Sequence, residues 1–456
     1  MSQQLPIIIL PIETKVRELH GKLFFTYMAA LEGFEVITGD QVKMMNYADL
    51  FPCGIYIDKS VAATRTEWFK QLRAMGHRVV SWDEEGLLFF SPDMYKRLRL
   101  DEDALSHVDL FFCWGRVQRD TILRWFPEIE KKLFLCGNPR ADLMRKDYRN
   151  FYRSTVQSLK NRYGKLLLVN TNFAFHNHFR SKRELRRMLD SYPLASEEGY
   201  IDGWVEYQRQ GFETFFAIIP ELSKRYHEYQ IIIRPHPSEN FGPWQHLADQ
   251  FSNVHVNGEG NVHEWIMASD VMLHDNCTTA VEAFILGIPP VSYRKEKGDG
   301  RYLNSLPDEL SYNVHTDDEL FETLDRAIQR NTALNDAIWS SDKQDIIRRY
   351  ISGMEGCTSV QEMLYHIRNR MEPVAVSSSI TTRLMRLLKK NWRKKLHKYR
   401  AMRSPADGYE KQKFSGLTHG EISEVFTALN TVLGNKHRFD IRKIVDDVYV
   451  VRRCQK

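Results

Sequence analysis

Short apolar runs alternate along most of the chain with segments whose apolar residues recur at helical spacing. The runs are three to seven residues long and rich in Ile, Val, Leu and Phe, which is typical of buried strands. The expected strands are Leu5–Pro11, Phe34–Thr38, Gly54–Ile57, Arg78–Trp82, Leu110–Trp114, Leu133–Cys136, Lys165–Val169, Gln230–Ile233, Val254–Val256, Asp270–Leu273 and Pro290–Tyr293. This alternation predicts an α/β protein with two doubly wound, Rossmann-like domains, each a parallel sheet covered by helices.

The length of 456 residues allows two or three domains. We expect an N-terminal Rossmann-like domain over residues 1–155 and a second one over residues 156–372. The polar stretch Asp147–Arg162 would bridge them or open the second domain. Residues 373–456 are expected to hold a linker, a basic helix and a small helical appendix around Glu421–Leu433, with no further strands.

The net charge of +5 comes from one segment. Ten lysines and arginines and no acid lie in Arg383–Arg403, where apolar and aromatic residues also recur at helical spacing. This pattern is typical of a helix on an anionic membrane surface, and the alternative is a solvated helix that packs its apolar stripe on the protein body. No nucleic-acid motif accompanies the segment, so we expect no nucleic acid as a partner.

The N-terminal stretch has no positively charged lead, and no run of eighteen apolar residues occurs. We therefore expect neither a signal peptide nor a membrane span. The six cysteines lack metal-type spacing, which predicts reduced thiols. Together these features predict a cytoplasmic protein, peripheral on the inner face of the cytoplasmic membrane.

Unusual polar clusters follow several of the expected strands. In open parallel sheets, ligands collect beyond the carboxyl ends of the strands. The clusters are "DEEG" (Asp83–Gly86), "GNPR" (Gly137–Arg140), "NTN" (Asn170–Asn172), "RPHPSE" (Arg234–Glu239) and "HDNCTTAVEA" (His274–Ala283). We expect them to converge on one cleft between the two domains.

Each cluster also has a structural interpretation. The acids of "DEEG" could cap a helix and fill its first turn. The two prolines that flank His236 fix its backbone, which suits a phosphate-binding imidazole but also an ordinary turn. Thr279 and Glu282 have capping-box spacing, whereas a helix N-terminus led by Thr278 and Thr279 could instead bind an anionic phosphate.

Other chemistries find little support. The sequence has no GxxxxGK[ST] phosphate loop and no GxGxxG after the first strand. Asp101-Glu102-Asp103 matches a D-x-D metal motif but is more simply a helix start. His176 and His178 could ligate a metal, but no paired cysteine or carboxylate motif supports this. We expect no metal in the active site.

Three of these motifs resemble those of known enzymes. "DEEG", "RPHP" and the threonine pair of "TTAVEAF" resemble the D/E-D/E-G, HP and S/T motifs of bacterial sialyltransferases and β-Kdo transferases. The stretches "LPIIILPIETKVREL", "GIYIDKS" and "LVNTNF" resemble a bacterial family of surface carbohydrate biosynthesis proteins. The resemblance covers residues 5 to 370. It is carried mainly by the order and spacing of the motifs.

The resemblance implies a GT-B fold with two Rossmann-like domains that face a cleft. It also implies a CMP-activated donor of a nonulosonic acid or Kdo. Glu84 matches the catalytic acid, flanked by Asp83 and Glu85, and His236 with Thr278 and Thr279 matches the CMP-phosphate site. Further donor contacts are expected from Arg234, Ser238, Glu239, Glu282, Asn170, Asn172 and Asn276. Donor or acceptor contacts are expected from Lys15, Arg17, Asn138 and Arg140.

The predicted function is therefore transfer of an acidic sugar from its CMP donor to a glycan or a lipid-linked glycan of the cell surface. We expect no cofactor besides the donor substrate. "DEEG" can be read in two registers, and its adjacency to Gly86 favours Glu84 as the first acid. Inversion and retention stay open. Two alternatives are a CDP-glycerol-type glycerophosphotransferase and a non-catalytic scaffold of polysaccharide assembly.

Overall fold

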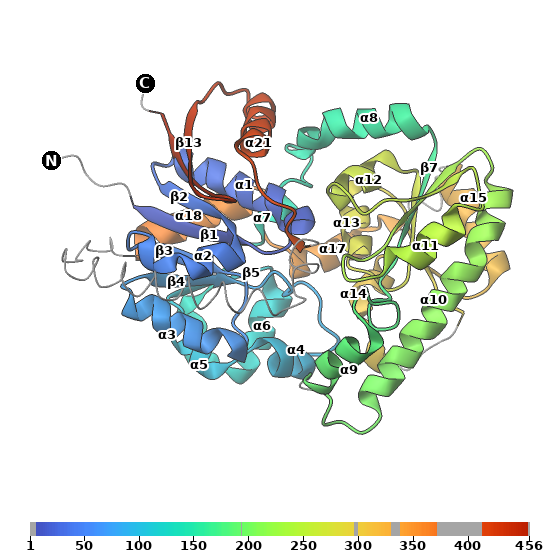
Figure 1. Ribbon diagram of the computed structural model, residues 1–456, viewed down its shortest axis with the longest axis horizontal. Helices are drawn as coiled ribbons and strands as arrows, with labels where there is room; N and C mark the ends of the chain where they lie inside the picture. The colour runs from blue at the N-terminus through green and yellow to red at the C-terminus, as the bar shows by residue number, and fades with distance from the viewer. Residues whose placement is uncertain (1–5, 193, 296–299, 330–337, 372–412, 455–456) are drawn as a thin grey trace. The chain divides into compact units, whose positions relative to one another are not determined.

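The computed structural model describes residues 6–192, 194–295, 300–329, 338–371 and 413–454. The chain forms two compact units. Unit 1 contains Met1–Leu87, Arg99–Leu143 and Arg349–Lys456, and unit 2 contains Leu88–Leu98 and Met144–Arg348 (Figure 1).

Unit 1 is built on a sheet of eight strands in the order β13-β14-β2-β1-β3-β4-β5-β6. The strands are β1 (Ile7–Ile12), β2 (Glu35–Asp40), β3 (Ile55–Asp58), β4 (Arg78–Trp82), β5 (Leu110–Cys113), β6 (Leu133–Leu135), β13 (Phe439–Val445) and β14 (Val448–Arg453). The first six are parallel, whereas β14 is antiparallel to both β2 and β13. Strand order reverses between β1 and β3, so the loops after these strands flank a topological switch point.

The helices of unit 1 connect these strands. They are α1 (Lys15–Leu31), α2 (Gln41–Asn46), α3 (Thr66–Ala74), α5 (Glu102–Ser106), α6 (Arg116–Trp125), α7 (Pro139–Asp142), α18 (Ser359–Arg370) and α21 (His419–Val432), with short 3-10 helices at Ala48–Leu50, Ala63–Arg65 and Pro127–Lys132. Helix α4 (Pro92–Arg99) ends at the junction of the two units. Helix α1 packs on β1, β2 and β14 and contacts α7, α18 and α21.

Unit 2 has a six-stranded parallel sheet in the order β12-β11-β10-β7-β8-β9. The strands are β7 (Leu166–Asn170), β8 (Gln230–Arg234), β9 (Val254–Val256), β10 (Val271–His274), β11 (Pro290–Tyr293) and β12 (Tyr312–Val314). Here the strand order reverses between β7 and β10. The loops after these two strands therefore flank the switch point of this unit.

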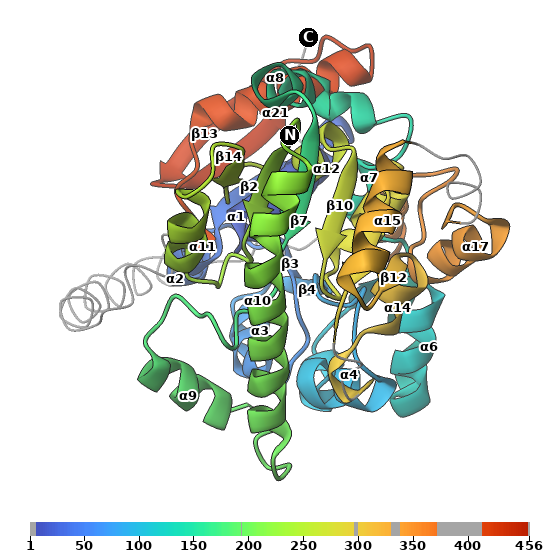
Figure 2. The same cartoon turned by 90° about the vertical axis from the view of Figure 1, so that its right-hand side faces the viewer.

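The helices of unit 2 cover this sheet. They are α8 (Arg153–Tyr163), α9 (Lys182–Asp190), α10 (Tyr200–Arg225), α11 (Phe241–Ala248), α12 (Val262–Ala268), α13 (Thr279–Leu286), α14 (Ser305–Glu309), α15 (Asp317–Ile328) and α17 (Ser341–Tyr350), with 3-10 helices at Arg149–Tyr152 and Gly300–Tyr302. Figure 2 shows α10 as the long helix that runs along this unit. Its Phe215, Ile218 and Leu222 pack against β-strand residues in the main core of the unit. A smaller aromatic cluster joins α9 and the start of α10 to Tyr302.

The eleven predicted strands are all present within about two residues of their expected bounds. Helix α3 ends at Ala74, and Gly76 shortly after it adopts a left-handed φ of +89°, which is typical of the residue that follows a helix. Strands β12, β13 and β14 were not predicted. The C-terminal hairpin extends the first sheet by pairing with β2, which was also not predicted.

The division of the chain differs from the predicted boundaries at 155 and 372. Residues 349–371 and the C-terminal segment belong to unit 1, where α18 contacts α1 and α7. The Asp142 carboxylate accepts hydrogen bonds from the backbone and hydroxyl of Ser359 and from the amide of Val360. It thereby caps α18 with a residue that lies more than two hundred positions earlier in the chain.

The predicted basic helix, residues 383–403, lies outside the described residues. Among the helices that the structure describes, none is both long enough and apolar enough to cross a bilayer.

The pairing of β14 with β2 predicts a sensitive position at Gly39. Its φ is +152°, and a Cβ there would lie 2.0 Å from the backbone oxygen of Asp447. We expect Gly39→Ala to displace the hairpin and to lower the free energy of unfolding by about 2 kcal/mol or more. Thermal unfolding checks this. Gly420→Ala is the control, because its nearest atom is 3.7 Å away, and equal melting temperatures for the two variants would contradict the prediction.

Candidate functional site

The "DEEG" stretch forms a turn at the carboxyl end of β4. The amide of Gly86 donates to the carbonyl of Asp83 at 3.0 Å, and the next helix begins only at Pro92. The interpretation of these acids as a helix cap is therefore wrong. A Cβ at Gly86 would lie 2.0 Å from the side-chain nitrogen of Gln118, so a larger residue here would have to displace that side chain.

Asp83 has a structural role in this turn. Its side chain is fully buried, and it accepts hydrogen bonds from the guanidinium of Arg99 and from the amide of Glu85. Its carbonyl accepts from the indole of Trp114 at 2.6 Å. Through these contacts Asp83 stabilises the turn. The register in which Asp83 is the reacting acid is therefore disfavoured.

Glu84 lies almost buried in the centre of the cluster, with 6% of its side chain exposed. Oε1 accepts from the indole of Trp82 at 2.7 Å and lies 3.8 Å from the ammonium of Lys22. Oε2 lies 3.5 Å from the side-chain amide of Asn138. Burial alone would raise the pKa of Glu84, but the charges of Lys22 and Arg140 outweigh burial and hold this pKa below its usual value.

Lys22 connects Glu84 to a second buried carboxylate, that of Glu18. The ammonium lies 3.0 Å from Glu18 and also donates to the carbonyl of Pro11 at the end of β1. Glu18 accepts from the amides of Glu13 and Thr14, one turn before it. Burial raises the pKa of Glu18, with Lys22 opposing. Two neighbouring carboxyls with pKa values shifted in opposite directions are typical of sites of acid–base chemistry.

The remaining residues predicted in this unit take distinct places. Arg17 pairs with Glu85 at 2.6 Å. Arg140 is buried with its guanidinium over the ring of Trp114, and Asn138 caps the helix that carries it, because its side chain accepts from the amide of Arg140. Lys15 instead donates to the carbonyl of Gly416 and to Glu421 of the C-terminal segment.

In unit 2, His236 lies in the loop after β8, and hydrogen bonds hold both its ring and its backbone. Its Nδ1 accepts from the amide of Ser238 at 3.2 Å. In the neutral ring the proton therefore sits on Nε2, which can donate to a phosphate oxygen. His236 is half-buried, as are Asn172 in the loop after β7 and Ser238 in the same loop as His236.

Glu239 holds this loop in place. Its carboxylate is fully buried and accepts hydrogen bonds from three segments of unit 2, which are the loop after β7, the loop after β8 and helix α11. The donors are the hydroxyl of Thr171 at 2.7 Å, the amides of Phe173 and His236 at 3.1 Å, the indole of Trp244 at 3.1 Å and the side chain of Asn177 at 3.4 Å. Burial raises the pKa of Glu239, with these hydrogen bonds opposing. Glu239 therefore ties the loop after β7 to the loop after β8.

The N-terminus of α13 carries the two predicted threonines. Thr278, and not Thr279, is the N-cap residue, and it makes no side-chain cap hydrogen bond. The capping box of Thr279 and Glu282, which was the structural alternative, is therefore not formed. The hydroxyl oxygen of Thr279 is buried and has no hydrogen-bond partner. Asn170, which ends β7 at the switch point, also has a buried side-chain oxygen without a hydrogen-bond partner. These polar atoms and the positive end of the α13 dipole suit an anionic ligand.

Three other predicted donor contacts serve unit 2 itself. The guanidinium of Arg234 donates to the carbonyls of Asn257, Glu259 and Gly260. Asn276, with a left-handed φ of 44°, exchanges hydrogen bonds with Asn304. Glu282 is buried on α13, with a carboxylate oxygen 3.6 Å from Nε2 of His263.

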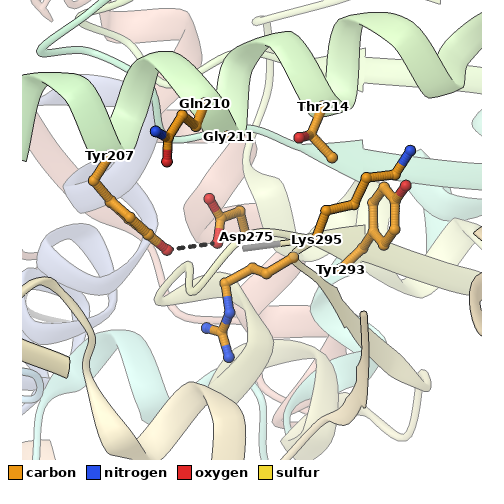
Figure 3. A pocket seen from close by; sticks show the side chains of 8 residues that line it. Tyr207, Gln210, Gly211, Thr214, Asp275, Tyr293 and Lys295 are labelled. Carbon is orange, nitrogen blue, oxygen red and sulfur yellow. Dashed lines mark hydrogen bonds between the residues drawn. The ribbon is translucent and has the colours of Figure 1, made fainter. Parts of the chain in front are cut away.

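Sequence reasoning missed a small pocket between α10 and the ends of β10 and β11. The hydroxyl of Tyr207 donates to Asp275 at 3.2 Å, and Gln210, Thr214 and Lys295 complete much of the wall (Figure 3). A Cβ at Gly211 would lie 2.7 Å from Asp275, so a glycine lets the helix pass close to this carboxyl. Asp275 is the residue of this pocket that the sequence could have indicated. It lies in the polar cluster His274–Ala283, but no role was predicted for it.

No group of three or more His, Cys, Asp or Glu side chains is arranged to hold a metal ion in the described part of the chain. The expectation that no metal is needed stays a prediction.

Comparison with known proteins finds similarity in structure alone. No model of a known protein family matches the sequence, and no curated protein matches it. A protein of Listeria monocytogenes assigned as a UDP-N-acetylglucosamine 2-epimerase has a TM-score of 0.50 and 12% identity, over 83% of this chain and 99% of that one.

Two further solved structures are similar. The UDP-GlcNAc 2-epimerase of Neisseria meningitidis bound to UDP-GlcNAc gives a TM-score of 0.47 at 12% identity, over 80% of this chain and 99% of that one. A variant of the wall teichoic acid polymerase TagF gives 0.49 at 12% identity, over 80% and 88% of the two chains. At such low identity, the match to the Listeria protein establishes the fold. The chain has a GT-B-like α/β fold with two Rossmann-like domains, as predicted.

The buried carboxyl of Asp275 predicts an effect of pH on stability. Burial raises its pKa to about 6, with Arg294 and Tyr207 opposing. The folded state then binds a proton that the unfolded state has already released, so this group makes stability fall as pH rises from about 4 to about 6. We expect Asp275→Asn to raise the free energy of unfolding at pH 7.5 by about 1 kcal/mol or more relative to the parent protein. The variant should therefore unfold at a higher urea concentration.

The gain should shrink as pH is lowered to about 4, because the parent aspartate is then protonated in both states. Urea unfolding at both pH values checks this. A variant that is less stable than the parent protein at pH 7.5 would show that ionised Asp275 is stabilised in the fold.

Proposed function

We propose that this chain is a glycosyltransferase that moves an acidic sugar, a nonulosonic acid or Kdo, from a CMP-linked donor to a surface glycan acceptor. The observation that carries the proposal is Glu84. Its carboxylate is nearly buried, is held ionised by Lys22 and Arg140, and lies at the carboxyl end of a parallel strand. Transfer at an anomeric carbon needs such a carboxylate, as a base or as a nucleophile.

The features of unit 2 support the second half of the reaction, which is departure of CMP. The leaving phosphate needs hydrogen-bond donors and positive charge. His236 can donate from Nε2, and the N-terminus of α13 offers the positive end of its dipole beside the hydroxyl of Thr279, which has no hydrogen-bond partner. His236 follows β8 and α13 follows β10, so both lie at the carboxyl edge of the same sheet. These strands flank β7, which is beside the switch point where ligands of such folds bind.

Other donors remain alternatives. Solved structures of similar fold include epimerases named for UDP-GlcNAc, so a UDP-sugar is one rival donor. CDP-glycerol is another, and a scaffold would bind no nucleotide. We favour an acidic sugar because Arg17, Lys59 and Arg99 surround the carboxylates of the "DEEG" turn and suit a substrate that carries its own carboxylate.

A panel of donors tests the proposal. We expect release of CMP from CMP-N-acetylneuraminic acid or CMP-Kdo in the presence of a glycan acceptor. Mass spectrometry identifies the product. UDP-GlcNAc and CDP-glycerol should give no product. Turnover of UDP-GlcNAc alone, or binding of none of these nucleotides, would reject the proposal.

The donor panel includes one matched pair of variants. His236→Ala should weaken CMP binding about tenfold, because a hydrogen bond to a charged phosphate contributes roughly 1.5 kcal/mol or more. His246→Ala, at an exposed histidine on α11, is the control and should bind CMP like the parent protein. Equal affinities for the two variants would remove His236 from the phosphate site.

The proposal also places the acceptor at an anionic membrane, through the basic residues 383–403. Truncation after residue 371 would not test this, because it also removes β14 and with it a partner of β2. An internal replacement of 383–403 by a Gly/Ser linker leaves the described C-terminal segment in the chain.

We expect this replacement to reduce co-sedimentation with vesicles that contain anionic lipid by about tenfold or more, since each Lys or Arg contributes about 1 kcal/mol near such a surface. High salt should have the same effect on the parent protein. Undiminished binding by the variant would contradict the membrane role of the segment.

A further inference from the structure

The Glu85 carboxylate lies among four cationic side chains of unit 1. Arg17, on α1, donates to it at 2.6 Å. Lys59 in the loop after β3, Arg99 at the end of α4 and Arg140 in α7 also attract it. These cations come from four separate segments, so the fold itself brings them to one place.

Glu85 differs from the two acids before it in exposure. Its side chain is 46% exposed, whereas those of Asp83 and Glu84 are 0% and 6% exposed. Desolvation would raise the pKa of Glu85, but Arg17 and Arg99 more than offset it, so its carboxyl is ionised at neutral pH. An exposed ion pair contributes only about 0–1 kcal/mol, so another anion can replace this carboxylate at little cost.

The contacts of Lys59 show that the fold itself holds these four cations in place. Its carbonyl accepts from the amide of Glu84 at 3.1 Å, and its ammonium pairs with Glu13. Glu13 in turn pairs with Lys413 of the C-terminal segment at 2.9 Å. Only 18% of the Lys59 side chain is exposed. The loops after β1, β3 and β4 are therefore joined around the position that Glu85 occupies.

We propose that Arg17, Lys59, Arg99 and Arg140 form a subsite for an anionic group of the substrate, and that Glu85 occupies this subsite in the free protein as an internal stand-in. The identification of that group as the carboxylate of the sugar rests on the proposed function. A phosphate has the same chemical requirement. Binding of the substrate anion displaces the Glu85 carboxylate toward water, and the two anions compete for the same cations.

The test is binding of small anions to Glu85→Gln, measured by ligand-observed NMR titration without donor or acceptor. The probes are free N-acetylneuraminic acid, its uncharged methyl ester and inorganic phosphate. We expect the variant to bind the free acid about fivefold more tightly than the parent protein, because the competing charge is gone. The methyl ester should show no gain, and 0.5 M salt should remove the gain for the acid.

Glu130→Gln is the matched control. Glu130 also lies in unit 1 and pairs with an arginine, Arg119, at 2.8 Å, and its substitution changes the net charge equally. It should give no gain. Arg17→Met should weaken binding of the acid, and Glu85→Gln should gain less in the Arg17→Met background, which measures their coupling. Glu85→Ala provides a second variant with the same expected direction.

Equal or weaker binding of the acid by both Glu85 variants would overturn the inference, as would an equal gain in Glu130→Gln. A larger gain for phosphate than for the sugar acid would support the subsite and overturn its assignment to the sugar carboxylate. Because no turnover is measured, these outcomes are separate from those of the donor panel. A protein that transfers no CMP-sugar can still show the Glu85→Gln gain.

Discussion

The ammonium of Lys22 is the charge on which the candidate site of unit 1 depends. Lys22 is 3% exposed and lies between two buried carboxylates, those of Glu18 and Glu84, while it also donates to the carbonyl of Pro11. A buried charge is tolerated only when it is paired and hydrogen-bonded. This arrangement joins the end of β1 to the turn after β4 and keeps Glu84 ionised in a place that water scarcely reaches.

Unit 2 also depends on one buried charged side chain, which here is a carboxylate. The buried carboxylate of Glu239 is surrounded by hydrogen-bond donors instead of by a cation, and all of these donors but the indole of Trp244 on α11 belong to the loops that follow β7 and β8. The backbone of His236 is one of them, so the imidazole is positioned by a residue that need not touch the ligand. We therefore regard Glu239 as a positioning residue, although its sequence position suggested a donor contact.

Much of the fold could be predicted because strand periodicity and turn residues are local signals. The eleven buried strands follow from such patterns, as does the end of α3 at Gly76. Strand β14 could not be placed in the first sheet, because its pairing with β2 is set by contacts between residues some four hundred positions apart. The β-branched and aromatic residues at the start of Val448–Arg453 could have indicated a strand, but not its partner.

The candidate site was predictable in location but not in the role of each residue. The rule that ligands bind beyond strand ends led to "DEEG", His236 and Thr279. It could not assign different roles to three adjacent acids, because only packing distinguishes them. Asp83 is buried and pairs with Arg99, and Glu84 is nearly buried beside Lys22. Glu85 is exposed and pairs with Arg17. Likewise, Arg234 and Asn276 look like ligand contacts in the sequence, but their hydrogen bonds are made within unit 2.

We propose above all that Glu84 performs the chemistry. The most direct measurement is the single-turnover rate of sugar transfer from saturating CMP-sugar, compared between the parent protein and Glu84→Gln. We predict a fall of roughly 10² to 10⁴, because the isosteric change removes the base or nucleophile. CMP affinity, measured in parallel, should be unchanged within about twofold, since the proposed phosphate contacts lie in the other unit. A Glu84→Gln protein that transfers sugar at the parent rate would contradict the claim.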